Sequence, residues 1–359
     1  MRSVVVLGPM TNGVTGGQAT HMKNLNALAD EIDDGIVEFF FTSRGMDETE
    51  SVKGKIIFFL ENICKSLFVL GRYSKVHINT SFDAKAIVRD FFYILVSFLY
   101  RKEVVIQYHG GDPFKINAAL RTLSKISLFF IKNGSSVICL TDKQFNFVTS
   151  LKVQNVGLVK NFVDVPDFQA KDLVSPINFI YMGRIIKEKG LFIILDAVEW
   201  LRKHSTVDFK VQICGNGKDL AEMLNEIERR GLNDSVIYHG IVGGVEKIRL
   251  LESSQIFLYP TSYPEGLPYS ILEALAYSLP VVSTNVGSIS SVVHDKETGI
   301  IVAEKNYLEL AKAMEYFIQN GNEIRRMGTQ GHLLVADKFG KKAMKDFFVN
   351  LWFLRGQQI

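Results

Sequence analysis

The chain of 359 residues is long enough for two domains of ordinary size, and 47% of its residues are hydrophobic, enough to fill two cores. Its three cysteines, Cys64, Cys139 and Cys214, lie far apart without CxxC spacing, which disfavours a disulfide framework or a zinc knuckle. The apolar runs at the N-terminus and at residues 91–100 are shorter than the roughly 20 residues of a membrane span. We therefore expect a soluble or peripheral protein without a signal peptide.

The first half of the chain alternates short apolar strands with helical patterns. We expect a strand at residues 3–8, a helix from about Ala19 to Ala29, and further strands in the runs GIVEFFF, KVHINT, EVVIQYHG, SVICLT and NVGLVKN. This alternation predicts an α/β domain with a mostly parallel sheet over residues 1–163.

The small net charge of +3 hides a basic, aromatic stretch between Ser51 and Lys132, which has 13 Lys and Arg residues against 5 Asp and Glu and ten of the 26 phenylalanines. Basic residues interleaved with aromatic ones indicate contact with an anionic membrane surface or an anionic lipid-linked substrate. A phenylalanine-rich core with ordinary solvated lysines is the alternative, and both interpretations stay open here. No nucleic-acid reader motif accompanies the charge, so we expect no nucleic-acid partner.

Two strand ends in this half carry candidate ligand-binding residues. Gly16 and Gly17 follow the first strand and open a helix, where a ligand can approach the backbone, although a tight turn explains them as well. His109 and Asp112 end a later strand in the run HGGD, where Asp112 can orient the imidazole or simply cap the next helix. His109 can bond a sugar hydroxyl or move a proton, with a structural histidine as the equal alternative. Without a complete GxGxxG motif, a dehydrogenase is disfavoured.

A proline-bearing segment, Val163–Ile177, separates this alternation from a second one. The second comprises the runs NFIYMGR, FKVQICGNG, SVIYHGIV, QIFLYP and PVVSTNVG with helices between them, and it predicts another α/β domain over residues 164–338. Residues 339–359 form an amphipathic helical pattern with no strand after it. Two such domains and a linker predict a cleft, with ligands beyond the carboxyl ends of the strands.

The strand ends of the second half hold charged and glycine candidates. Arg184 and Lys189, five residues apart, can clamp a diphosphate and stabilise a leaving group without a metal, although two ordinary surface bases are the alternative. Gly183 precedes this pair, and Gly215 ends the next strand in a GNG turn. The run HGIV can offer its backbone to a nucleobase edge while Ile241 and Val242 pack on the face of the base.

Two glutamates flank the start of one helix. Glu265 lies in a loop after IFLYP, and Glu273 lies in the helix that this loop opens, with Pro268 suited to the first helical turn. The free N–H groups of that turn favour an anion, and the carboxylates can accept hydrogen bonds from hydroxyls on either side of a phosphate. Two solvent-facing glutamates are the simpler alternative. The chain has no HxxxH cluster and no Asp-x-Asp motif, so we expect no metal site.

These motifs in this order (GG, HGGD, GRIIKEKG, GNG, HGIV and PEGLPYSILEALAYSLPVVSTNVG) resemble the retaining glycosyltransferases of family four, which have the GT-B fold. The resemblance covers nearly the whole chain and is most specific in the C-terminal half. Two runs depart from the family pattern: KNFVD replaces the usual PNG, and EGLP replaces the frequent EGFG. The family fold implies two Rossmann-like domains that face each other across a cleft, with the final helix packed back on the N-terminal domain.

The resemblance also implies roles for the candidate residues. Arg184 and Lys189 would hold the donor diphosphate, Glu265 the transferred sugar, and Glu273 the ribose. His109 would touch the sugar near the reacting carbon, so the implied catalytic residues are His109, Arg184, Lys189 and Glu265. The implied donor-binding residues are Gly16, Gly17, Gly183, Gly215, Ile241, Val242, Gly266, Leu267, Pro268 and Glu273.

The activity implied is metal-independent transfer of a hexosyl group, with retained configuration, from a nucleotide sugar to a glycan acceptor. We expect a UDP-sugar donor, no cofactor, and a lipid-linked acceptor in O-antigen, lipopolysaccharide or capsule assembly. A cytoplasmic protein, peripheral on the inner face of the cell membrane, fits this work. A nucleotide-sugar epimerase of the same fold and a non-catalytic nucleotide-sugar-binding protein remain alternatives; a phosphorylase lacks support because no convincing pyridoxal-lysine motif is present.

Overall fold

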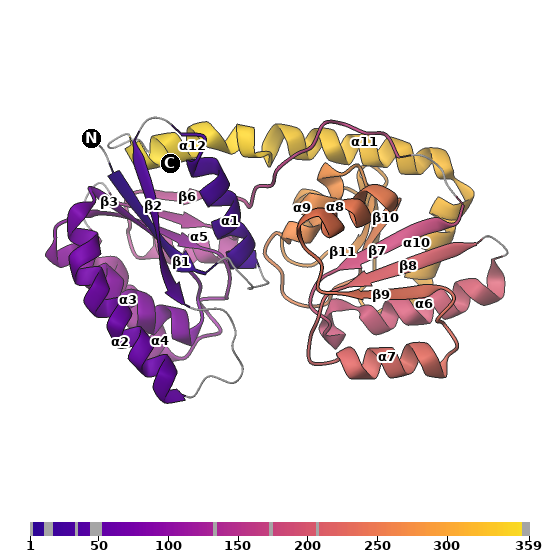
Figure 1. Cartoon of the computed structure of the whole chain (residues 1–359), viewed down its shortest axis with the longest axis horizontal. Coiled ribbons are helices and arrows are strands. Elements are labelled where there is room, and N and C mark those ends of the chain that lie inside the picture. The colour runs from indigo at the N-terminus through magenta and orange to yellow at the C-terminus, as the bar shows by residue number, and fades with distance from the viewer. Residues whose placement is uncertain are drawn as a thin grey trace. The chain divides into compact units, whose positions relative to one another are not determined.

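The structure, a computed structural model, describes residues 3–10, 17–32, 35–43, 52–131, 135–171, 175–205 and 208–353. The chain divides into two units: Met1–Phe162 with Lys341–Ile359 form the first, and Val163–Gly340 form the second (Figure 1). Each unit has a six-stranded sheet whose neighbouring strands are parallel. The predicted class, two α/β units with parallel sheets, is confirmed.

The sheet of the first unit has the strand order β2-β1-β3-β4-β5-β6. Its strands are β1 (Ser3–Pro9), β2 (Ile36–Ser43), β3 (Lys75–Thr80), β4 (Glu103–Tyr108), β5 (Ser136–Cys139) and β6 (Val156–Leu158). Its helices are α1 (Gly17–Ala29), α2 (Val52–Val69), the 3-10 helix η1 (Leu70–Arg72), α3 (Ala84–Leu99), α4 (Ala118–Phe129), α5 (Asp142–Ser150) and α12 (Lys341–Phe353).

Different helices cover the two faces of this sheet, because successive side chains of a strand point to opposite faces. On β1, Val5 and Leu7 belong to one core with residues of α3 and α5, whereas Val4 and Val6 belong to another with residues of α1 and α12. Parallel strands covered on both faces need continuous apolar runs, and the run VVVL is one. Helix α12 thus completes the first unit, as the sequence predicted for the final helix.

A buried histidine ties α12 to the sheet. Trp352 of α12 donates its indole N–H to Nδ1 of His77 on β3, at 3.0 Å. Because indole can only donate, Nδ1 of His77 carries no proton, and Nε2–H donates to Oε1 of Gln107 at 3.1 Å. His77 is fully buried, and burial lowers its pKa from 6.5 to about 3. The packing of α12 therefore requires a neutral imidazole.

We expect the first unit to lose stability in acid. The folded-state pKa of His77 lies below its unfolded value of 6.5, so its contribution is fully present above pH 6.5 and is lost as the pH falls toward 3. The loss is about 1.4 kcal/mol per pH unit, or roughly 2 kcal/mol by pH 5. Urea unfolding should be followed through Trp352 in a Trp200→Phe background, since these are the two tryptophans of the chain.

The control is a pair of histidine substitutions. His77→Gln should reduce the slope of unfolding free energy against pH, and His21 and His109 should supply the remaining slope because burial lowers the pKa of each. Replacement of the exposed His204 by glutamine should leave the slope unchanged. An equal slope in wild type and His77→Gln would show that His77 titrates normally.

The sheet of the second unit has the strand order β12-β11-β10-β7-β8-β9. Its strands are β7 (Ile177–Met182), β8 (Phe209–Cys214), β9 (Val236–Gly240), β10 (Ile256–Tyr259), β11 (Val281–Thr284) and β12 (Gly299–Val302). Its helices are α6 (Leu191–His204), α7 (Leu220–Arg229), α8 (Gly244–Ser253), α9 (Tyr269–Ala276), α10 (Tyr307–Gln319) and α11 (Gly321–Lys338), with 3-10 helices η2 (Lys187–Lys189) and η3 (Ile289–Ser291).

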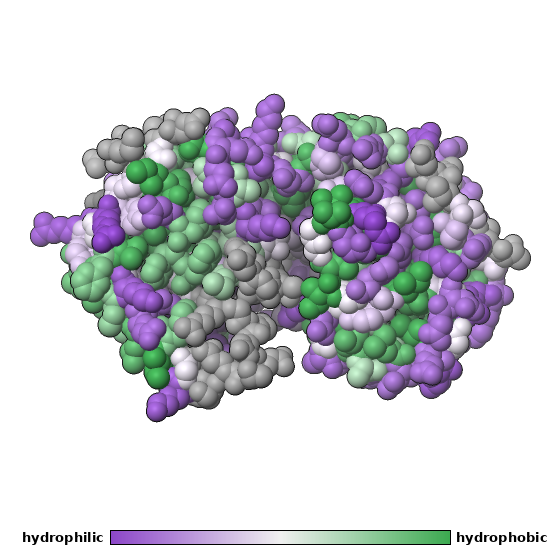
Figure 2. Space-filling view, viewed as in Figure 1, coloured by the Kyte–Doolittle hydropathy of each residue, from purple (hydrophilic) through white to green (hydrophobic). Residues whose placement is uncertain are grey.

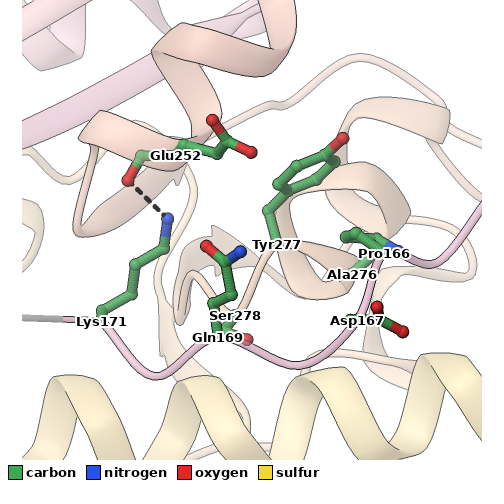
Figure 3. A pocket seen from close by; sticks show the side chains of 8 residues that line it. All are labelled: Pro166, Asp167, Gln169, Lys171, Glu252, Ala276, Tyr277 and Ser278. Carbon is green, nitrogen blue, oxygen red and sulfur yellow. Dashed lines mark hydrogen bonds between the residues drawn. The ribbon is translucent and has the colours of Figure 1, made fainter.

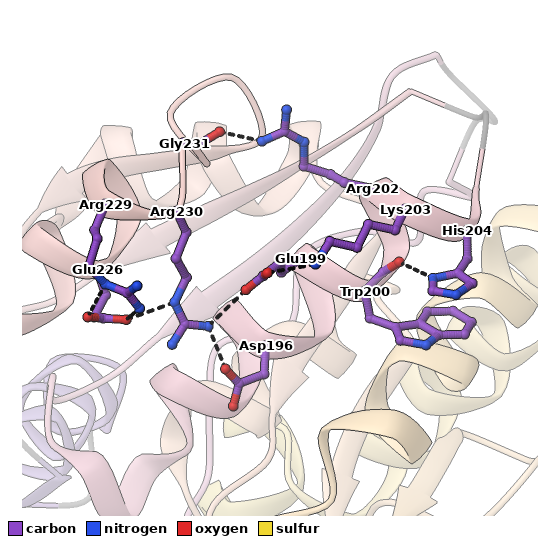
Figure 4. Close-up of polar contacts among 10 residues, drawn as sticks. All are labelled: Asp196, Glu199, Trp200, Arg202, Lys203, His204, Glu226, Arg229, Arg230 and Gly231. Carbon is purple, nitrogen blue, oxygen red and sulfur yellow. Dashed lines mark hydrogen bonds and ion pairs between the residues drawn. The ribbon is translucent and has the colours of Figure 1, made fainter.

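An ion-pair network joins α6 to the end of α7 on the surface of the second unit (Figure 4). Arg230 binds Asp196 at 2.5 Å and Glu226 at 2.8 Å, and Glu199 lies 3.5 Å away. These residues hold two helices together beside the sheet.

In the parts of the chain that the structure describes, no helix is long and apolar enough to cross a membrane.

Candidate active site

The order of the second sheet reverses between β7 and β10. From β7 the chain proceeds through β8 and β9 on one side, and then returns to β10, β11 and β12 on the other. Loops that leave the carboxyl ends of two such strands diverge, and the crevice between them is where open α/β sheets bind ligands. The loop after β7 carries Arg184 and Lys189, and the loop after β10 carries Glu265. Three of the four predicted catalytic residues thus lie at the reversal point.

Lys189 and Glu265 form an ion pair across this reversal point. The pair is largely withdrawn from solvent, with side chains 6% and 11% exposed. Lys189 Nζ also donates to the Tyr259 hydroxyl at 2.6 Å, and that hydroxyl lies 3.2 Å from Glu265 Oε1, as a donor to it. Burial lowers the pKa of Lys189, and the Glu265 carboxylate opposes this shift. The carboxylate is thereby held by groups from both loops.

Arg184 and Lys189 flank one aromatic ring. The Arg184 guanidinium lies 4.7 Å from the centre of the Tyr263 ring, and Lys189 Nζ lies 5.1 Å from the same centre. Arg184 is exposed, and its carbonyl accepts a hydrogen bond from the Tyr181 hydroxyl at 2.9 Å. The two cations that the sequence singled out therefore lie together, one buried and one reaching solvent.

Tyr259 and Tyr263 support this pair, although no pattern in the sequence singled them out. They frame the loop that carries Glu265, in the run YPTSYPEG. Tyrosines at the end of a buried strand are usually core residues, so their positions alone gave no reason to choose them. Their spacing of four around a loop rather than along a helix was the available signal.

The start of α9 follows this loop directly. Pro268 is the residue just before the helix, at φ −64° and ψ 130°, rather than inside its first turn as predicted. Leu267 is only 2% exposed and packs in the core, and the carbonyl of Gly266 accepts a hydrogen bond from Ser288 N at 3.4 Å. The core packing of Leu267 and the hydrogen bond to Gly266 thus fix the end of this loop before the helix begins.

Glu273 lies in α9 and pairs with a lysine that sequence analysis did not identify. Its Oε1 lies 2.7 Å from Nζ of Lys247 on α8, and its side chain is 19% exposed. Nothing in the spacing of Lys247 singles it out among the 41 Lys and Arg residues. The pairing leaves the other carboxylate oxygen of Glu273 outside this ion pair.

The remaining candidates of the second unit lie at the ends of β7, β8 and β9. Gly183 N donates to Cys214 O at 3.0 Å, and Gly215 N donates to Gly240 O at 2.7 Å, so the three strand ends are bonded in sequence. Ile241, just after β9, is 58% exposed, and Val242 packs against the core. Ile241 is thus free of the core.

In the first unit, His109 is held by an asparagine. Its Nε2 lies 2.7 Å from Asn79 Oδ1, and the Asn79 amide donates to Leu7 O at 3.2 Å, so the oxygen faces the imidazole. Nε2 is therefore the protonated nitrogen, and Nδ1 is an acceptor. Burial and the nearby His77 lower the pKa of His109 to about 3, which keeps the ring neutral. The centre of the ring lies 4.1 Å from that of the His21 ring, and the two rings are tilted by 47°.

The remaining candidates of the first unit are Asp112, Gly16 and Gly17. Asp112 does not orient His109; it accepts a hydrogen bond from Phe114 N at 2.9 Å and pairs with Lys143. Gly17 begins α1, and Gly16 lies outside the described residues.

A small pocket in the second unit lies at the C-terminal ends of α8 and α9 and involves none of these residues (Figure 3). Its buried Lys171 donates to the carbonyls of Leu251 and Glu252, at 2.7 and 2.9 Å. Burial lowers the pKa of Lys171 to about 8. Its amine satisfies the last carbonyls of α8, a structural role.

In the described part of the chain, no three His, Cys, Asp or Glu side chains are grouped so that they could hold a metal ion.

Residues 167–333 match the family model of glycosyl transferases group 1. The chain is 26% identical over 263 residues to the O-antigen chain mannosyltransferase C of Escherichia coli, covering 69% of this chain and 68% of that protein. It is 25% identical over 249 residues to the D-rhamnosyltransferase WbpZ of Pseudomonas aeruginosa, covering 65% and 63%.

Among solved structures, the chain is similar to Alr3699/HepE of Anabaena in complex with UDP and glucose, with a TM-score of 0.75 and 15% identity over 98% of this chain and 99% of that one. The lipopolysaccharide outer core galactosyltransferase WaaB has a TM-score of 0.68 at 15% identity, over 98% and 99%. These likenesses confirm the predicted GT-B fold. The chain thus has the GT-B fold, and residues 167–333 of its second unit are similar to glycosyl transferases group 1.

Proposed function

We propose that this protein is a retaining glycosyltransferase that moves a hexosyl group from a nucleotide sugar to a glycan hydroxyl. The observation that carries the proposal is the cluster of Arg184, Lys189 and Glu265 at the reversal point of the second sheet, within the residues that match glycosyl transferases group 1. Two cations suit a diphosphate, and a carboxylate fixed by several donors suits the hydroxyls of a sugar.

The reaction breaks the bond between the anomeric carbon and the diphosphate oxygen, and the bonding electrons leave with the nucleoside diphosphate. The acceptor oxygen forms the new bond on the same face of the sugar, and its proton passes to the departing phosphate oxygen. Lys189 and Arg184 stabilise the charge that grows on the diphosphate, an effect that is strong because Lys189 is withdrawn from water. This chemistry requires neither a strong protein base nor a metal ion.

The donor is a UDP-sugar, and Glu273 binds its ribose. The solved structure of HepE, which has the same fold, is a complex with UDP and glucose, and this supports UDP as the nucleotide of the donor. Lys247 holds one oxygen of Glu273, and the other can accept hydrogen bonds from the ribose diol. Ile241, exposed at the end of β9, offers an apolar surface to the base.

Glu273→Gln is expected to raise the KM for the nucleotide sugar by about 10- to 100-fold, because a hydrogen bond to a charged group contributes roughly 1.5–3 kcal/mol. The kcat should change little, since the ribose does not react. Initial rates at varied donor concentration measure both constants. Glu246→Gln on α8, where the exposed carboxylate pairs with Arg249, is the control and should behave as wild type. A fall in kcat with unchanged KM would contradict a ribose contact.

The acceptor is a lipid-linked glycan on the cytoplasmic face of the cell membrane. The support comes from relatives named as O-antigen and colanic acid glycosyltransferases, together with the basic, aromatic stretch of the first unit. Peripheral contact with an anionic membrane would bring the protein to such an acceptor.

The test uses the slow transfer of the sugar to water in the absence of an acceptor. Proton NMR with UDP-glucose, UDP-galactose and GDP-mannose should show release of the nucleoside diphosphate, and the sugar should first appear with the anomeric configuration of the donor. An inverted sugar would overturn the retaining mechanism. An epimerised sugar would identify an epimerase, and tight binding without any product would identify a binding protein.

A further inference from the structure

Helices α2, α3 and α4 of the first unit expose large apolar side chains. Of the 25 large apolar residues that are exposed within the described ranges, 13 lie between Ile56 and Phe129, so this stretch carries about half of them. Leu60 and Phe68 on α2 are 56% and 75% exposed, Leu99 on α3 is 67% exposed, and Phe129 on α4 is 84% exposed. Figure 2 has green surface among purple over this part of the first unit. We call the exposed side of these three helices the α2–α4 face.

Several inner positions of α2 and α4 are small and polar. Among the described side chains of α2, Asn62 and Ser66 are the buried ones. Helix α4 buries Ser124 and Ser127 beside Leu128, whereas α3 buries larger residues such as Tyr93 and Ile94. The hydroxyls of the two serines of α4 donate hydrogen bonds within their own helix, to the carbonyls of Leu120 and Leu123. A helix that meets water normally has the opposite pattern, with large apolar residues inside. Small residues at helix contacts with large apolar residues outside are typical of helices that face lipid.

The phenylalanines of this stretch decide between the two interpretations of the sequence. Of the ten between Ser51 and Lys132, only Phe82 is buried; the others are partly or largely exposed. A phenylalanine-rich core therefore does not account for them. Phe92, Phe98 and Phe130 contact other rings at the surface of these helices, with Phe98 and Phe130 centres 5.0 Å apart.

The charges around the face favour an anionic partner. Lys53, Lys65 and Lys125 are exposed on α2 and α4, and Arg101 is exposed just after α3. The exposed carboxylates are Glu61 on α2 and Asp83 just before α3. Each basic side chain near an anionic bilayer contributes roughly 1 kcal/mol. A symmetric contact with a second copy would instead bring the same lysines of both copies to one interface. Charge thus favours lipid over self-association.

We infer that the α2–α4 face docks into the headgroup region of an anionic lipid bilayer, with α2 lying in the plane of the interface. The inference deepens the proposed function, since it identifies the surface that brings the protein to a lipid-linked acceptor. Interfacial helices of this kind combine an apolar face with flanking Lys and Arg residues, and they bind without crossing the membrane.

The experiment is flotation of the full chain with vesicles of phosphatidylcholine, alone or with phosphatidylglycerol. Wild type should bind the anionic vesicles at least about tenfold more tightly than the neutral ones, and added salt should weaken this binding. Leu60→Ser with Phe68→Ser should reduce binding at least about tenfold. Because both residues are exposed, the thermal unfolding of this variant should match wild type.

The matched control replaces Leu333 and Val245 of the second unit, which are 55% and 82% exposed, by serine. It should bind vesicles as wild type does. Absence of wild-type binding to either vesicle, or full binding by the Leu60 and Phe68 variant, would overturn the inference. So would a wild-type dimer that the Leu60 and Phe68 substitutions convert to monomer. Release of nucleotide from a soluble donor is measured without vesicles, so its failure would count against the proposed function alone.

Discussion

Lys189→Met is expected to lower kcat by about 100- to 1,000-fold, the usual effect of removing one preorganised donor to a developing negative charge. Methionine preserves most of the volume of the lysine stem but not the charge. The side chain is buried between two loops and beside the Tyr263 ring, so neither water nor a flexible surface cation can take its place. Single-turnover release of nucleoside diphosphate measures the loss.

The chain supplies a matched control on the same 3-10 turn. Lys187 is exposed and pairs with Glu222 on the surface, so Lys187→Met should keep wild-type turnover. Removal of Lys189 alone leaves the Glu265 carboxylate without its cation, which can destabilise the protein by about 3–5 kcal/mol. The double variant Lys189→Met with Glu265→Gln removes both charges and should fold while remaining inactive. Wild-type turnover by a folded Lys189→Met protein would contradict the catalytic role proposed for this lysine.

Gly190→Ala is expected to separate the two loops of the site. Gly190 has φ +83°, and a Cβ there would lie 2.1 Å from the carbonyl oxygen of Pro260, in the loop after β10. The expected loss of stability is roughly 2–5 kcal/mol, from about 1–2 for left-handed strain and about 1–3 for overpacking. Lys189 precedes this glycine directly, so the shift should also lower kcat. Urea unfolding and turnover at low temperature measure the two effects.

The control for Gly190→Ala is a glycine that also has a positive φ but has no atom close to where a Cβ would lie. Gly231 has φ +60°, and a Cβ there would meet nothing within 4 Å. Gly231→Ala should therefore cost only the strain of the left-handed conformation, about 1–2 kcal/mol, and should keep full activity. Equal destabilisation by the two alanines would mean that the contact with Pro260 contributes nothing.

The architecture could be predicted from the sequence because parallel strands that are covered on both faces form continuous apolar runs. The runs KVHINT and FKVQIC begin and end where β3 and β8 do. The short strand β12 was missed because GIIV is a brief apolar run at the edge of the sheet, without the flanking motifs of the others. Strand order is likewise absent from local patterns, since it depends on which strands pair.

The site was predicted in part for a similar reason. Arg184, Lys189 and Glu265 follow strands directly, and strand ends of a parallel sheet meet at one edge. Two other candidates, Glu273 and His109, are held by residues that have no local signal in the sequence. Lys247 reaches Glu273 from α8, and Asn79 fixes His109 from a neighbouring strand. Such partners are chosen by tertiary packing, which a single sequence does not display.

We propose that the second unit binds a nucleotide sugar at the Lys189–Glu265 pair. The most direct test is thermal unfolding of wild type and Lys189→Met with UDP, GDP, ADP and their common sugars, each with and without EDTA. A ligand at 100 times its Kd adds about 2.7 kcal/mol of stability, which such a scan resolves. We expect stabilisation by UDP and a UDP-sugar that EDTA leaves unchanged and Lys189→Met largely abolishes. Absence of a shift with every nucleotide, or an equal shift in the variant, would contradict the account.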